Sequence, residues 1–160
     1  MADWLAGQRI TAERLRAGQG VWQDYTPSWT ASTANPSVGN GQLIGRYMRV
    51  GNTVDFMLRI VAGSTTNFGN GPYDFGLPIP PKSWGAGSNL GAVGQCVIQI
   101  DNHRYGFGVL LYSTGLVRVA NGSTSGLGND ASSVPPVGHD GHPWGDGDLL
   151  MLSGRYEVDE

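Results

Sequence analysis

The sequence predicts an all-β fold, an antiparallel β-sandwich or jelly roll over residues 21–160, preceded by a short N-terminal anchoring segment over residues 1–20. Short runs of alternating apolar and polar residues recur along the chain and are separated by turn residues. Glycine makes up 26 of the 160 residues and proline 9, without the triplet period of collagen. No helical pattern follows residue 20, and no fixed-period repeat indicates a propeller or a solenoid.

The clearest predicted element is a β-hairpin over residues 43–61. Its second run places Val54, Phe56, Leu58 and Ile60 on one face, because side chains two residues apart in a strand point the same way. The dipeptide Gly51-Asn52 separates the two runs, and a two-residue loop with glycine first favours a type II′ turn. We therefore predict a tight hairpin with one apolar face.

Residues 1–20 differ from the rest of the chain. Thr11 as an N-cap and Gly18 as a stop signal predict a short helix, which is too short to be stable alone. Docking on a partner would order it, with apolar contacts from Trp4, Leu5, Ile10 and Leu15. Composition leaves two interpretations open, a loose arm and an attachment peptide that folds on a partner.

The remaining strands follow from shorter patterns. An aromatic, threonine-rich run predicts a strand over Val21–Thr33, in which Pro27 lacks an amide donor and belongs at an edge or a bend. Apolar faces are predicted from Cys96, Ile98 and Ile100, and from Leu150, Leu152, Tyr156 and Val158. The sequence predicts seven or eight strands, the others being Tyr73–Leu77, Leu90–Ile100, Tyr105–Tyr112, Leu116–Ala120 and Leu149–Val158.

Composition excludes several classes of function. Only 14% of the residues are charged, the net charge is −3 and there is one lysine, so a nucleic-acid surface is not expected. A surface this poor in charge suits protein assembly or sugar contact. Cys96 is the single cysteine, which excludes an intrachain disulfide and suggests core packing. No apolar stretch approaches the ~20 residues of a membrane span, and no signal segment opens the chain, so we expect a product that stays in the cytoplasm unless it leaves in a particle.

Candidate catalytic and metal-binding residues are few. His139, Asp140 and His142 could in principle ligate zinc or nickel, but a polar turn is the competing interpretation and no fourth ligand is evident. The Gly-x-Ser-x-Gly motif is absent, and the three glutamates lie near the chain ends, which disfavours a two-carboxylate glycosidase. We predict no catalytic residue, no cofactor and no enzymatic activity.

Aromatic residues in polar segments are the more useful indication of function. Trp84, Trp144 and the pair His103 and Tyr105 could stack on sugar rings, while neighbouring amides and carboxylates bind the hydroxyl groups. The alternative is that these rings pack into the rim of the sandwich or into a subunit interface.

A set of short motifs spans nearly the whole chain and resembles a β domain of minor tail and fibre proteins of tailed bacteriophages, particularly those of actinobacteria. The opening peptide is similar to the start of many such virion proteins. The motifs are Trp4-x-x-Gly7-Gln8-x-Ile10-Thr11-Ala12-x-x-Leu15, Tyr25-x-Pro27-x-Trp29-Thr30, Pro36-x-Val38-Gly39-Asn40-Gly41, Gly45-Arg46-Tyr47-x-Arg49-x-Gly51-x-Thr53-Val54, Gly69-x-Gly71 with Phe75-x-Leu77-Pro78, Trp144-Gly145-Asp146-Gly147-Asp148 and Gly154-Arg155-Tyr156-Glu157.

The resemblance implies a structural virion protein, assembled in the host cytoplasm and often homotrimeric. Residues 1–20 would anchor it to other virion proteins, and the β domain would face outward. We expect a tail fibre or receptor-binding tip that contacts host-surface carbohydrate through loops such as Lys82–Gly91 and Asn121–Trp144. The alternatives are a capsid decoration or head-fibre protein without a receptor and, from a different class, a cell-wall glycan hydrolase module.

Overall fold

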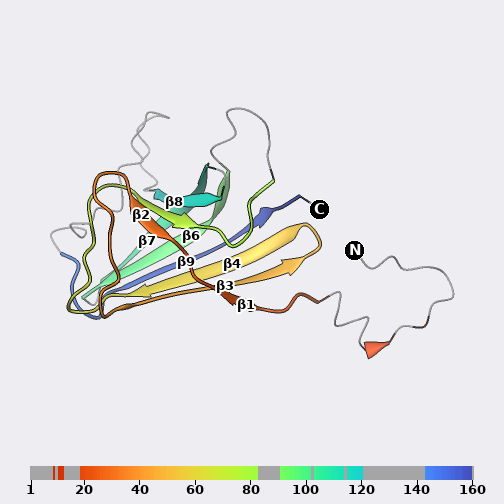
Figure 1. The fold of residues 1–160 in the computed structure, drawn as a ribbon, viewed down its shortest axis with the longest axis horizontal. Coiled ribbons are helices and arrows are strands. Elements are labelled where there is room, and N and C mark those ends of the chain that lie inside the picture. The colour runs from red at the N-terminus through yellow and green to blue at the C-terminus, as the bar shows by residue number, and fades with distance from the viewer. Residues whose placement is uncertain are drawn as a thin grey trace.

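The computed structural model describes residues 9, 11–12, 19–82, 91–101, 103–113, 115–120 and 143–159. In these residues the chain forms one antiparallel sheet of nine strands in the order β1-β3-β4-β9-β6-β7-β8-β5-β2 (Figure 1). The strands are β1 (Gln23–Tyr25), β2 (Trp29–Ala31), β3 (Gln42–Val50), β4 (Thr53–Val61), β5 (Tyr73–Gly76), β6 (Ala92–Ile100), β7 (His103–Ser113), β8 (Leu116–Ala120) and β9 (Leu149–Glu157).

The sheet is open and folds over on itself, so that β2, β5 and β8 lie above β3, β4 and β9 with the core between them (Figure 1). This arrangement confirms the predicted all-β antiparallel fold and is consistent with a sandwich. The two layers are joined by Tyr156 on β9, whose hydroxyl donates to the Ile79 carbonyl at 2.8 Å and accepts from the Ile79 amide at 3.4 Å. Aromatic contacts around Trp29, Phe68, Tyr73 and Phe75 fill the other side of the core.

The central hairpin is confirmed in detail. Val50 pairs with Thr53, so Gly51 and Asn52 alone form the turn. Gly51 has a φ of 57° whereas Asn52 is not among the residues of positive φ, which is the pattern of a type II′ turn. The predicted inward face is buried, with at most 3% exposure from Val54 to Ile60 at alternate positions. The predicted apolar faces of β6 and β9 are buried as well.

The predicted strand over Val21–Thr33 is wrong as a single element. It divides into β1 and β2, which pair with β3 and β5 at opposite ends of the strand order. The buried Pro27 lies between them. Proline lacks the amide hydrogen that a ladder needs, so the chain bends there and crosses from one layer to the other.

A charged pair is buried away from the apolar core. Asp74 on β5 lies opposite Arg118 on β8. Two hydrogen bonds of 2.7 Å join the guanidinium to the carboxylate, and each side chain is only 11% exposed. The sequence did not indicate this pair, because the two residues are brought together by strand pairing alone.

The sandwich has two ends with different connections. At the hairpin end lie Gly51-Asn52, Lys82 and the C-terminal residues, where the Val158 amide donates to the Asn52 carbonyl and the Lys82 amide to the Glu157 carbonyl. At the loop end, the connections after β2 and β4 meet the segment before β9, and the Asp148 carboxylate accepts from the Asp101 and Gly145 amides. The two loops predicted to contact carbohydrate are thus attached at opposite ends, since Lys82 marks one and the segment containing Trp144 the other.

Candidate binding face

The side of β3, β4, β9 and β6 that points away from the core, together with the flanking Trp22 and β7, is here named the outer face. Side chains alternate along a strand, so burial of one set leaves the other set outward. Ile44, Met57, Val97 and Met151 lie on this face and expose between 37% and 47% of their surface. The strand register places outward residues of five adjacent strands side by side in one row. This row consists of Ile44, Arg59, Met151, Val97 and Gly106.

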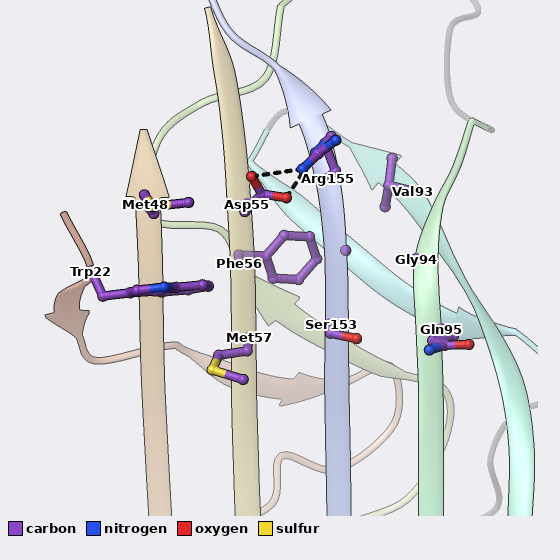
Figure 2. Close-up of a pocket in the computed structure, with 11 residues that line it drawn as sticks. Trp22, Met48, Asp55, Phe56, Met57, Val93, Gly94, Gln95, Ser153 and Arg155 are labelled. Carbon is purple, nitrogen blue, oxygen red and sulfur yellow. Dashed lines mark hydrogen bonds and ion pairs between the residues drawn. The ribbon is translucent and has the colours of Figure 1, made fainter. Parts of the chain in front are cut away.

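The outer face is hollowed into two adjoining grooves. The larger, of about 770 Å³, lies between Trp22 and Met48 on one side and Gln95 on the other (Figure 2). The smaller, of about 380 Å³, shares Met57, Gln95 and Ser153 with the first and continues towards Arg104. Because these lining residues are shared, the grooves form one continuous depression across β4, β9 and β6.

Glycines shape the floor of the larger groove. Gly154 on β9 pairs with Phe56 on β4, and a side chain there would lie 2.7 Å from the Phe56 ring. Gly94 on β6 faces the backbone of β9 so closely that a side chain would overlap the Ser153 carbonyl oxygen. The ring of Phe56, which is only 1% exposed, therefore packs against Gly154 directly beneath the floor of the groove, where Figure 2 shows it between β4 and β9.

Charged groups border the grooves in pairs. Asp55 accepts hydrogen bonds of 2.7 and 3.1 Å from Arg155, and this bonding raises the pKa of the guanidinium (Figure 2). Arg155 is 70% exposed, so the pair orients the two side chains more than it stabilises the fold. Arg46 bonds Asp24 at 2.9 Å and lies 5.9 Å from the centre of the Trp22 ring.

The grooves can support non-covalent contact through apolar, amide and guanidinium groups. Asp55 is their one carboxylate among the described lining residues, and its two oxygens are bonded to Arg155. A general acid–base pair needs two titratable groups poised for proton transfer, and the lining does not provide them. Within the described ranges, no group of three or more His, Cys, Asp or Glu residues is placed to hold a metal ion.

Three of the aromatic residues predicted from the sequence, Trp144, His103 and Tyr105, are described by the structure and lie away from the grooves. Trp144 stacks on Phe68, with ring centres 5.3 Å apart and planes 19° apart, and packs against the core. His103 is exposed and stacks with the half-buried Tyr105 at 6.5 Å. Both pairs are at the loop end, and one face of the Trp144 ring is already covered.

Several predicted site residues lie outside the described residues. They are Trp84 as a carbohydrate contact, the possible metal ligands His139, Asp140 and His142, and the attachment residues Trp4, Leu5, Ile10 and Leu15. Among the residues that are described, no helix combines the length and apolar character needed to span a bilayer.

Sequence reasoning missed the outer face. A signal for it was present, because Met57 and Met151 occupy outward positions of strands whose inward positions are already apolar. An apolar residue on both sides of a strand indicates that both sides make contacts. What the sequence could not supply was the register that places these residues side by side.

Comparison with protein-family models, with curated proteins and with solved structures found no match to this chain. We therefore infer the function of the chain from its residues, from their arrangement and from the motif resemblance.

Proposed function

We propose that this chain is a non-enzymatic structural protein of a tailed-phage particle, a trimeric tail fibre or receptor-binding tip. Residues 1–20 would attach it to other virion proteins, and the β-sandwich would face outward and contact carbohydrate on the host surface. A capsid decoration or head-fibre protein is the second candidate. A wall-glycan hydrolase module ranks below both, because the larger groove has no acid–base pair among its described residues.

One observation supports the proposal above the others, namely that motif segments distant in sequence pack together. The rings of Tyr25 and Tyr47 meet edge to face, with centres 5.9 Å apart. A side chain at Gly45 would come within 2.5 Å of the Tyr25 ring and 2.6 Å of Pro27. These residues come from two different segments of the motif set. The two segments therefore pack together as one unit, as expected if the motifs belong to a shared structure.

The location of the protein in a particle tests the assignment. Particles released by the producing cell would be purified and examined by electron cryomicroscopy, with an antibody to the β domain as a marker. Density and label at the tail tip are expected. Label on the capsid would replace the tip by the decoration alternative, and absence of the chain from purified particles would overturn the phage assignment.

Carbohydrate contact can be tested separately on the isolated protein. The change His103→Ala removes an exposed ring that stacks on Tyr105 and leaves the core intact, so we expect severalfold weaker binding to host wall glycan on an array. Trp22→Ala is the matched control, since Trp22 is an exposed aromatic residue on the outer face. If neither variant changes binding, the loop-end aromatic pair is not the glycan contact. Release of reducing sugar by the wild type would favour the hydrolase.

A further inference from the structure

The outer face has the composition of a protein–protein contact. Interface centres are enriched in methionine and arginine and poor in lysine and unpaired carboxylates. Met48, Met57 and Met151 line the grooves, and Arg46, Arg59, Arg104 and Arg155 surround them. The single lysine of the chain lies at the hairpin end, 3.8 Å from Glu157. From this face we infer that a second copy of the same chain binds here.

Gly106 provides a second, independent observation. It lies in the middle of β7 opposite Val97, is exposed, and a side chain added there would meet no atom within 4 Å. The fold therefore does not require glycine at this position, in contrast to Gly94. Glycine inside a strand weakens the strand and often marks a place where another backbone approaches closely. The slot that Gly106 leaves beside Val97 fits a side chain from an approaching partner.

Charge indicates which partner fits. Among the residues that the structure describes, Arg59 makes no hydrogen bond or ion pair, and Arg104 bonds the Gln99 amide oxygen at 3.2 Å. Asp24 and Asp55, two carboxylates at the outer face, already bond Arg46 and Arg155. The whole chain has a net charge of −3, so the residues outside the outer face together carry the excess of negative charge. A second copy thus offers the carboxylates that Arg59 and Arg104 lack.

The outer face is also large enough to form a stable interface with a second copy. With strands ~4.8 Å apart and a rise of ~3.3 Å per residue, the span from β3 to β7 covers roughly 500–600 Å² in projection. A stable interface buries about 800 Å² of accessible surface on each partner, and the accessible area of a grooved face exceeds its projection. The inference rests on the self-association included in the proposed function and not on the phage assignment.

The variant Gly106→Val tests the interface without disturbing the fold. Valine favours strands, and its side chain enters open space, so the melting temperature should equal or exceed that of the wild type. Association of the full chain, measured by sedimentation velocity and light scattering over a concentration series, should weaken by at least about tenfold. Gly91→Val is the matched control, because a side chain at Gly91 also meets nothing within 4 Å but lies before β6.

The possible outcomes test self-association separately from the location of the interface on the outer face. A wild-type chain that stays monomeric at every soluble concentration overturns self-association itself. An oligomer that Gly106→Val and Gly91→Val leave equally intact overturns the assignment of the interface to the outer face. If Gly106→Val lowers the melting temperature more than the control, Arg59→Glu replaces it. That change reverses an exposed charge and should weaken association, and unchanged or tighter association would contradict the inference.

Discussion

Replacing Asp74 by leucine tests how the sandwich accommodates a charged pair away from its apolar core. The carboxylate receives two hydrogen bonds of 2.7 Å from Arg118, and each side chain is 11% exposed. Removing the carboxylate leaves a guanidinium that water can barely reach. Breaking a buried pair in this way costs about 3–5 kcal/mol of unfolding free energy. For a domain of this size that corresponds to a fall in melting temperature of roughly 6–20 °C.

The double variant Asp74→Leu with Arg118→Met tests whether the loss of stability comes from the charge that Asp74→Leu leaves buried. Both charges are then absent, so no buried guanidinium has lost its carboxylate, and stability should return to within about 1–2 kcal/mol of the wild type or exceed it. Urea unfolding followed by tryptophan fluorescence measures the unfolding free energy of each variant. Asp74→Asn offers a milder single change if the leucine variant does not fold.

The exposed pair between Asp55 and Arg155 is the matched control. It also joins opposite residues of two antiparallel strands through two hydrogen bonds, but Arg155 is 70% exposed. Water can replace the lost partner there, so Asp55→Leu should change stability much less than Asp74→Leu. Equal losses for the two leucine variants, or a double variant as unstable as Asp74→Leu alone, would contradict a large cost of breaking the buried pair between Asp74 and Arg118.

Further predictions concern the core, the turn and alkaline pH. Phe56→Ala should lower the unfolding free energy by about 3–5 kcal/mol in urea titrations, because the ring is buried under the groove floor, and a loss below about 1 kcal/mol would contradict that packing. Gly51→Ala should cost about 1–2 kcal/mol by the same assay, since φ is 57° in the turn, whereas Gly91→Ala should not. Burial raises the pKa of Tyr156 to about 12 and that of the Cys96 thiol to about 12. The unfolded chain therefore ionises first, so this stabilisation is complete below about pH 9 and is lost as the pH rises towards 12. Melting temperatures from circular dichroism should fall over that range, and a constant value would contradict it.

Local pattern was enough to predict much of the fold. The alternation in β4 identified every buried residue of that strand, and Gly51-Asn52 located the turn. Such features depend on neighbours along the chain, because the period of a strand and the φ requirement of a turn are local properties. The predicted strand over Val21–Thr33 was wrong because local propensity did not reveal that β1 and β2 join different layers.

Little of the candidate site could be predicted in the same way. Trp144 and the pair of His103 and Tyr105 were identified from the sequence as rings in polar surroundings, but the stacking of Trp144 on Phe68 depends on the fold. The grooves of the outer face were not predicted. They require β4, β9 and β6 to lie side by side, and these strands come from widely separated parts of the chain.

By itself, the sequence determined which residues of each strong strand point inward and where the tight turns fall, because these follow from side-chain alternation and glycine conformation. Tertiary structure alone decided what the outward residues meet. Asp55 and Arg155 are 100 positions apart, yet they pair, and the Phe56 ring packs against Gly154 only because β9 lies beside β4. The reason is physical: strand order is set by hydrogen bonds between distant segments, and a surface extending over several strands exists only after those segments have paired.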